Sequence, residues 1–553
     1  MKKNITLKCI SFIAIGSCSV LPLILSSCSI GGIVFANYES YMSPDLIAKN
    51  RTIDGQQVRY VSYSTNEDIQ AKFKRSYDIA VPSTYTVLEL IKEDDLANIN
   101  WSMFSNDGNP LNSNTYKPWE EEYMPSDWDG SYLIQYAAPY TSSKYSGTRV
   151  ERQNEARNDP HNALTLFSDT VINIVFSVDD YVHALDEHIY GDDETLLNYS
   201  LPYFDEDLMF AYHGDYIGDA TNNDGGAYDL TAPSYDETNN LWYSKDATWD
   251  KITDAISPNK NSNLDDRFKP SNKQHMALVD DSRSFYDLCH LASTNTNDVN
   301  PSDDEQTMQK IGDTYESVTG KFNPNTFFIN SDSQQILYSF ADPMGNPDDA
   351  TEAQANGIIS YSGDVAYAAM GGGNDDWTSV WNCAPLGSNS DLVDGNIHIV
   401  KPRYTMVALD MVVVNKRDQN SQPVYDLLKS CILDGAAAAP TSDDDADSWI
   451  GKGVTEDEDT NNPLYNTIIN FEYTYYEPTL WVTKEFVSRN SEYPNPTNSY
   501  FDIKYEGDEN KAELLAEINN VNFESDDLLL ELPLSVLTKS NMSFEYMQHK
   551  EKM

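Results

Sequence analysis

The sequence predicts an α/β protein in which helices cover a parallel sheet. Between residues 33 and 95, three runs typical of strands alternate with three stretches typical of helices. Strand–helix units of the same kind recur near residues 276, 357 and 405. Such alternation favours a parallel sheet. Hydrophobic residues make up 40% of the chain and aromatic residues 12%, which is enough to bury a sizeable core.

The first three units are the clearest. Ser43 and Pro44 supply a helix N-cap and a proline at the first helical position. Ile69 and Phe73 lie four residues apart, so they share one face of the second helix. We expect strands at residues 33–38, 58–63 and 77–81, and helices that begin at Ser43, Thr65 and Thr84, the last of them reaching Asp95.

Two stretches rich in aromatic and hydroxyl side chains follow strands of this region. Residues 38–41 come after the first strand, and residues 83–85 come after the third. In open parallel sheets, ligands bind beyond the carboxyl ends of the strands. These two stretches are therefore candidate binding residues.

The rest of the chain alternates between such units and long polar stretches. We expect further strands at residues 276–279, 357–361 and 405–414, and helices from Arg283, at 364–370, 424–433, 511–518 and 526–537. The polar stretches are acidic or rich in Asn and Ser, which is typical of surface insertions. They cover residues 107–129, 215–240, 342–355 and 441–462, and the whole of 107–240 has no recognisable counterpart.

The charge is strongly acidic. The 553 residues hold 37 Lys and Arg against 88 Asp and Glu, a net charge of −51. Phosphate binding needs clustered cations, so this charge excludes nucleic-acid binding as the main function. At ~150 residues per domain, the length suggests about three or four domains.

The N-terminus has the features of a targeting segment. Lys2, Lys3 and Lys8 precede an apolar run at residues 10–25, which is short for a membrane span. The stretch that ends at Cys28 resembles the lipobox of bacterial lipoproteins, in which the signal is removed and the cysteine is lipidated. We expect a signal peptide at residues 1–27 and a lipid anchor on Cys28, with a short membrane anchor as the alternative.

Neither a metal site nor an enzyme active site is predicted. His183 and His188 are five residues apart, which does not fit paired ligands on one helix face. The acidic loop near Asp443 lacks the glycine of a calcium loop. Nucleotide-binding and nucleophile-elbow fingerprints are absent from the sequence, and no cofactor is expected. Outside the signal, Cys289, Cys383 and Cys431 are far apart and are interpreted as buried small hydrophobic residues.

Two carboxylates stand in unusual places. Asp410 interrupts the apolar run 406–414, where an unpaired buried charge is costly. It therefore needs a cationic partner, hydrogen bonds or a ligand, and a role in capping a neighbouring loop is an equal alternative. Asp281 closes another apolar strand, where a local ion pair with Arg283 is the alternative to ligand binding.

Several of these stretches together resemble one family. Residues 37–41 (Asn-Tyr-Glu-Ser-Tyr), 63–67 (Tyr-Ser-Thr-Asn-Glu) and 77–85 (Tyr-Asp-Ile-Ala-Val-Pro-Ser-Thr-Tyr) follow one another at close spacing. They resemble the N-terminal part of bacterial spermidine/putrescine-binding proteins, the solute receptors of polyamine ABC transporters. Residues 279–283, 359–363 and 409–410 resemble later islands of that family, so that the resemblance covers about half of the chain.

The resemblance implies a two-lobe fold of the periplasmic-binding-protein type (type II), with a polyamine in the cleft between the lobes. It implies a first lobe from residues 28–137 and 405–480, and a second lobe from 138–404 and 481–553. The implied ligand contacts are aromatic side chains, carboxylates and one hydroxyl: Tyr38, Glu39, Tyr41, Ser83, Tyr85, Asp281, Tyr361, Asp410 and Tyr476.

The implied function is ligand capture by a lipid-anchored extracytoplasmic monomer, which delivers the polyamine to a membrane permease driven by a cytoplasmic ATPase. Aromatic rings suit both the methylenes and the ammonium groups of such a ligand. The chain departs from the family at Ser40, Ser284 and Ala408. The alternatives are a different small solute, or a surface interaction lipoprotein that has lost ligand binding.

Overall fold

The computed structural model describes the elements of the α/β core. It describes residues 32–104, 163–191, 194–213, 235–236, 241–242, 248–257, 276–294, 327–330, 333–341, 355, 357–369, 397–400, 402, 405–433, 465–480, 483–484, 529–530 and 532–551. Cys28 and Cys383, the predicted helix at 511–518 and most of the predicted insertions lie outside these residues. No helix in the described part combines the length and the apolar character that a membrane span requires.

The first part of the sheet comes from the N-terminal units, as predicted. Strand β1 (Gly32–Tyr38) pairs in parallel with β3 (Gln56–Tyr63) on one side and β4 (Ile79–Ala80) on the other. The short β2 (Thr52–Ile53) adds an antiparallel edge, and β12 (Met406–Val414) continues the sheet beyond β4.

Helices connect these strands. They are α1 (Pro44–Lys49), α2 (Asn66–Ser76) and α3 (Thr84–Lys92). The Thr65 side chain caps α2 by accepting a hydrogen bond from the Asp68 amide, and Pro44 stands at the start of α1. Both helix starts were predicted from the sequence.

The second part of the sheet repeats the pattern. Strand β8 (Met276–Val279) pairs in parallel with β9 (Phe327–Asn330) and β10 (Gly357–Tyr361). Helices α7 (Ser282–Thr294) and α10 (Ser362–Ala369) follow β8 and β10. Strand β8 and strand β10 have the predicted bounds.

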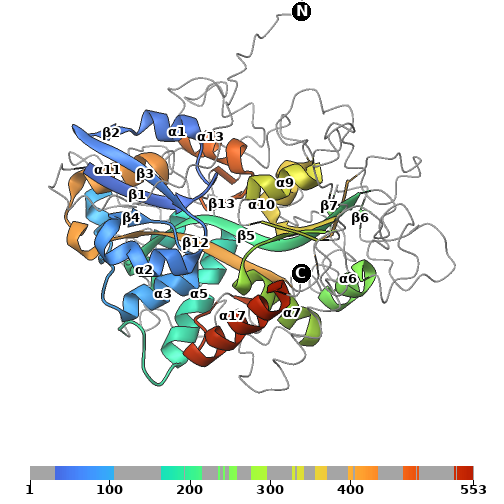
Figure 1. Cartoon of the computed structure of the whole chain (residues 1–553). Coiled ribbons are helices and arrows are strands. Elements are labelled where there is room, and N and C mark those ends of the chain that lie inside the picture. The colour runs from blue at the N-terminus through green and yellow to red at the C-terminus, as the bar shows by residue number, and fades with distance from the viewer. Residues whose placement is uncertain are drawn as a thin grey trace, which may run out of the picture.

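One long strand joins the two parts (Figure 1). Strand β5 (Ser200–His213) pairs antiparallel with β12 through its first half, and with β10 and β11 (Ile397–Val400) through its second half. The sequence placed this strand in a stretch without a counterpart. Residues 163–213 instead contribute α5 (Asp169–Ala184) and β5 to the core of the molecule.

Two clusters of buried apolar side chains accompany the two parts of the sheet. The first includes Phe35 and Val412, and the second includes Phe210 and Leu278. Tyr361 packs against both. The two clusters and the mixed sheet confirm the predicted α/β fold with two lobes. The lobe boundaries stay predictions; helix α5, which they assign to the second lobe, packs in the first cluster.

The remaining helices flank the sheet. They are α6 (Trp249–Ile256), α9 (Ser333–Ala341), α11 (Gln422–Cys431) and α13 (Tyr465–Thr474), with β13 (Glu477–Pro478) pairing with β5. The helix predicted at residues 526–537 is wrong. Residues Leu529–Leu530 form β14 beside β12, and the last helix, α17, covers Val536–Glu551. Pro533 lies between the two elements, and a proline interrupts a helix because it lacks an N–H donor.

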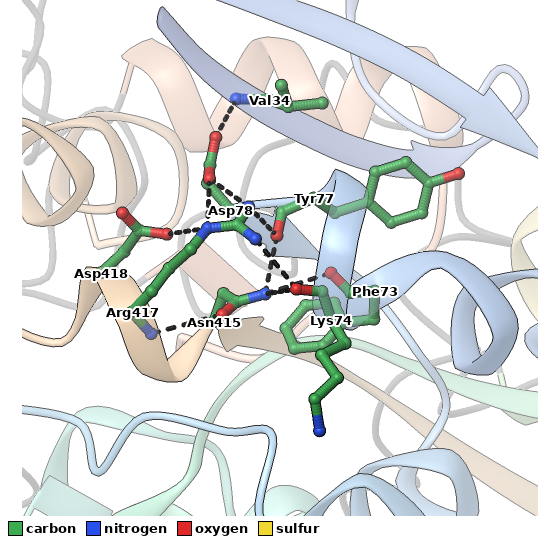
Figure 2. A network of polar contacts seen from close by, with 8 residues as sticks. All are labelled: Val34, Phe73, Lys74, Tyr77, Asp78, Asn415, Arg417 and Asp418. Atoms are coloured by element: carbon green, nitrogen blue, oxygen red, sulfur yellow. Dashed lines mark hydrogen bonds and ion pairs between the residues drawn. The ribbon is translucent and has the colours of Figure 1, made fainter. Parts of the chain in front are cut away.

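A polar network fastens β12 to the N-terminal units (Figure 2). The Arg417 guanidinium donates to the carbonyls of Lys74 and Tyr77 at 2.9 Å each and forms an ion pair with Asp78 at 2.5 Å. Asp78 also accepts from the Val34 amide at 2.7 Å. Each contact joins segments that are distant in the sequence, so the network fixes β12 against β1 and α2.

We expect Arg417→Ala to lower the free energy of unfolding by about 1–3 kcal/mol, since it removes the cation paired with Asp78 and one of the donors to the carbonyls of Lys74 and Tyr77. Asp418 adds to the loss, because burial and the nearby Asp78 carboxylate already raise its pKa to about 6. Urea unfolding measures the change. Lys416→Ala is the matched control: its ion pair with Asp94 is exposed, and its loss should cost less than ~0.5 kcal/mol. Equal effects of the two variants would contradict the role of Arg417.

Candidate functional site

The site starts where β1, α3 and β12 meet. Tyr38 is the last residue of β1, and its hydroxyl lies 3.3 Å from the Ser83 hydroxyl. Ser83 precedes the first residue of α3 and donates a 2.7 Å hydrogen bond to Asp410 on β12. Three residues predicted as ligand contacts are thus brought together: Tyr38 and Ser83 at the carboxyl ends of β1 and β4, and Asp410 inside β12.

Asp410 is buried, with 4% of its surface exposed. Burial raises the pKa of its carboxyl to about 7, while hydrogen bonds from Ser83 and with Glu206 oppose the rise. Hydrogen bonds satisfy it in this structure, one of the outcomes that the sequence left open. Near neutral pH the carboxyl is therefore poised between its charged and uncharged forms.

Aromatic rings pack together beside this carboxyl. The Tyr41 ring packs edge-on against Tyr38, with centroids 5.6 Å apart, and against Tyr476 at 5.0 Å. Tyr63 packs against Tyr38 at 4.7 Å. Burial and the Asp410 charge both raise the pKa values of Tyr38 and Tyr63, so these phenols stay protonated. Four rings therefore form one contiguous aromatic wall.

Tyr476 reaches this wall from the segment between α13 and β13. Its hydroxyl interacts with the Asp364 carboxyl of α10, whose pKa burial raises to about 6. A Cβ added at Gly363 would lie 2.5 Å from the Tyr476 ring, so only glycine lets the helix approach so closely.

A second group of predicted residues lies at the ends of β8 and β10. The Ser284 hydroxyl donates to Asp281 at 2.8 Å and lies 2.9 Å from the Tyr361 hydroxyl. Ser284 therefore links Asp281 to Tyr361 directly. The sequence marked Ser284 only as a departure from the family pattern.

Arg283 connects the two groups. Its guanidinium lies 5.0 Å from the centre of the Tyr85 ring, a cation–π contact between α7 and α3. Its ion pair is with Asp287, at 2.8 Å, and both side chains are buried. The sequence offered an ion pair between Arg283 and Asp281 as the alternative to ligand binding. In the structure, Arg283 pairs with Asp287 instead.

Glu39 and Glu206 differ most from expectation. Glu39 is exposed, whereas the neighbouring Tyr38 and Tyr41 belong to the aromatic wall. Glu206 was not predicted, although it is buried, accepts a hydrogen bond from the Tyr41 hydroxyl and hydrogen bonds with Asp410. Its only signal in the sequence is an acidic triplet, Asp205 to Asp207, inside the apolar run of β5.

The described part of the chain also contains two free cysteines and the pair His183 and His188. Cys289 and Cys431 are buried thiols that form no disulfide, in line with their interpretation as small hydrophobic residues. His183 and His188 do not share a helix, because α5 ends at Ala184, and their rings lie 5.9 Å apart. Among the described residues, no group of three or more His, Cys, Asp or Glu could hold a metal ion.

Sequence comparison confirms the resemblance to the polyamine receptors. The spermidine/putrescine-binding periplasmic protein of Escherichia coli is 31% identical over 121 residues, which cover 21% of this chain and 33% of that protein. The protein of the same name from Salmonella typhimurium is 33% identical over 107 residues, 18% of this chain and 30% of that protein. The chain thus matches about a third of the length of these curated relatives.

Solved structures give a weaker likeness over a longer span. The spermidine/putrescine ABC transporter substrate-binding protein of Streptococcus pneumoniae is 15% identical, covers 94% of this chain and 99% of its own, and has a TM-score of 0.42. A lipoprotein of Treponema pallidum gives 12% identity, coverages of 94% and 98%, and a TM-score of 0.40. TM-scores this low support no functional assignment.

One family profile covers most of the chain. The profile described as "Hypothetical lipoprotein (MG045 family)" matches residues 1–121 and 143–512. The match includes all four tyrosines of the aromatic wall and the three later strand–helix units near residues 276, 357 and 405. The protein therefore belongs to the hypothetical lipoprotein family MG045.

Proposed function

We propose that the protein is the solute-binding component of an ABC importer and that its ligand is a polyamine. The observation that carries the proposal is the buried Asp410 carboxyl behind a wall of tyrosine rings. The names of the curated relatives point to polyamines as the ligand class, and the match to a lipoprotein family supports a protein anchored to the membrane.

The chemistry of the site fits such a ligand. A polyamine is a chain of methylenes with several ammonium groups. Ring faces accept the methylenes by apolar contact and attract the charges with ~0.5–2 kcal/mol each. A buried carboxylate provides the charge-assisted hydrogen bond that fixes an amine in place. No group in this arrangement is needed to make or break a bond, so the function is binding.

In this proposal, the two groups of residues bind different parts of the ligand. Tyr38, Tyr41, Ser83, Asp410 and Tyr476 would hold one part. Asp281 and Tyr361, at the ends of β8 and β10, would hold the other part, and Tyr85 on α3 would contact the ligand where the two groups meet. Hinge closure of the two lobes would then capture the ligand and present it to the permease and its cytoplasmic ATPase.

Anchoring on Cys28 gives a prediction for the full chain. We expect Cys28→Ala to yield an uncleaved precursor without an acyl label, because the modified cysteine becomes the first residue of the mature protein. Metabolic labelling with a fatty acid and intact-mass spectrometry measure both features. Cys18→Ala, inside the expected signal, is the control and should be processed normally. Wild-type protein that keeps residues 1–27 would contradict the anchor.

A thermal-shift screen tests the proposed function. Putrescine and spermidine should each raise the melting temperature in a saturable way, whereas a monoamine of similar length should have a weaker effect, since it brings a single charge. If only another class of solute raises the melting temperature, that solute and not a polyamine is the ligand. No shift with any small solute would favour a surface interaction lipoprotein.

A further inference from the structure

Glu206 and Asp410 lie on the same face of the sheet, on the neighbouring antiparallel strands β5 and β12. Glu206 is paired in register with Ala408, and Asp410 is two residues further along β12. Residues directly opposite in an antiparallel pair share a face, as do residues two apart on one strand. Ala408, which stands opposite Glu206, has a small side chain, and the two carboxyls hydrogen bond to each other.

Both carboxyls are shielded from water. Glu206 has 5% of its surface exposed and Asp410 has 4%. Two buried carboxyls within hydrogen-bond reach cannot both be ionised without a large cost, so such pairs hold a proton between them. Aspartic protease dyads show the same behaviour.

We propose that Glu206 is a second ligand-binding carboxyl, and that Glu206 and Asp410 share one proton that leaves for solvent when an ammonium group binds between them. This inference rests on the proposed function. The ammonium offers three N–H donors, enough to satisfy both carboxylates. Charge balances, because one proton departs as at least one positive charge arrives.

The groups that face the pair are mostly neutral. Tyr41 donates its hydroxyl to Glu206, and Ser83 donates to Asp410. Among the described residues, the phenols of Tyr38, Tyr63, Tyr203 and Tyr476 also interact with the pair, and all four have raised pKa values. Asp364 lies one step away, against Tyr476, and Arg283 is engaged with Asp287 and the Tyr85 ring.

These surroundings favour the shared proton. The phenols stay neutral at physiological pH, and the pKa of Asp410 is raised to about 7 by burial. A ligand cation is then the group that lets both carboxyls ionise. Binding should weaken about tenfold for each unit of pH below ~7, because a proton must be displaced at each binding event.

Calorimetric titration of the full chain in detergent tests the proposal with putrescine and spermidine as probes. Runs at pH 6.5 in buffers of different ionisation enthalpy count the protons released. We expect a release of between one half and one proton from the wild type. Glu206→Gln should release less, because the introduced amide can donate to the Asp410 carboxylate in place of the shared proton. At pH 8, Glu206→Gln should lower the affinity about tenfold or more, since it removes one of two buried charges.

Asp207→Asn is the matched control, because Asp207 carries the same charge on the opposite face of β5. It should release protons as the wild type does. Amine binding without proton release by the wild type would overturn the inference and leave the proposed function standing. An unchanged affinity of a folded Glu206→Gln variant would do the same.

Absence of polyamine binding to the wild type would instead be a failure of the proposed function. The shared proton can still be measured without ligand, from the pH dependence of unfolding. A carboxyl whose pKa is raised in the folded state stabilises the protein at low pH and loses that contribution as the pH rises toward ~7. The wild type should show this loss between about pH 4 and 7, and Glu206→Gln should show less of it. Identical curves would overturn the shared proton.

Discussion

Replacing Lys484 by methionine is expected to lower the free energy of unfolding by about 3–5 kcal/mol. The Lys484 ammonium forms an ion pair with Glu477, and both side chains are buried. Glu477 is paired in register with Asp205 of β5, whose side chain is also buried. Without the lysine, Glu477 and Asp205 would remain buried, and Glu477 would lose the ammonium that forms its ion pair.

Urea unfolding measures this loss, and a double variant tests its cause. Lys484→Met combined with Glu477→Leu removes both charges, so most of the lost stability should return. Lys72→Met is the surface control, because its ion pair with Asp68 is exposed and should contribute less than ~1 kcal/mol. A loss below ~1 kcal/mol in the Lys484 variant would contradict a structural role for the buried pair.

Asp410→Asn should weaken polyamine binding by about 30-fold or more, which corresponds to ~2–5 kcal/mol for one partner of a buried charge pair. Asparagine keeps the shape of the side chain and an oxygen that can accept from Ser83, so the geometry is preserved. The change removes the negative charge that an amine would meet. Calorimetric titration with spermidine and putrescine measures the loss.

Stability should change in the opposite direction. The pKa of Asp410 is raised to about 7 in the folded protein, above its value in an unfolded chain. The ligand-free wild type therefore loses stability from this group as the pH rises from about 4 to 7. The asparagine side chain of the Asp410→Asn variant cannot ionise, so the variant should be the more stable of the two at pH 8. A purely structural role predicts the reverse, with lower stability and unchanged affinity.

Asp179→Asn provides the matched control for a buried aspartate with a structural role. Asp179 is fully buried, and it accepts hydrogen bonds from the Tyr190 hydroxyl at 2.5 Å and the Leu196 amide at 2.9 Å. It lies on α5, and its partners lie in the segment between α5 and β5. This variant should lose stability and keep its affinity for polyamines. Opposite behaviour of the two aspartates would separate binding from folding.

The sequence predicted the parts of the fold that depend on local patterns. Short apolar runs and helix caps predict the β1–α1–β3–α2–β4–α3 order. The buried β12 is an apolar run that only Asp410 interrupts. The same local patterns placed Tyr38, Ser83 and Asp410 at strand ends or inside a strand. Contact between the three depends on strand order, and the family resemblance supplied that expectation.

The central β5 was missed for a physical reason. Its acidic triplet, Asp205 to Asp207, is typical of a surface loop when taken alone. In the structure, these acids pair with β12, and Asp205 also pairs with β13; both strands come from segments more than 140 residues away in the sequence. Local patterns carry no information on such pairing, and Glu206 was therefore absent from the predicted site.

Equilibrium dialysis of labelled spermidine against the full-length protein in detergent tests the central claim most directly. The wild type at pH 8 should bind one spermidine per chain in a saturable manner, unlabelled putrescine should compete, and Asp410→Asn should retain little label at the same concentrations. A folded wild-type protein that retains no spermidine at millimolar concentration, or an Asp410→Asn variant that retains as much as the wild type, would contradict the polyamine site between the two lobes.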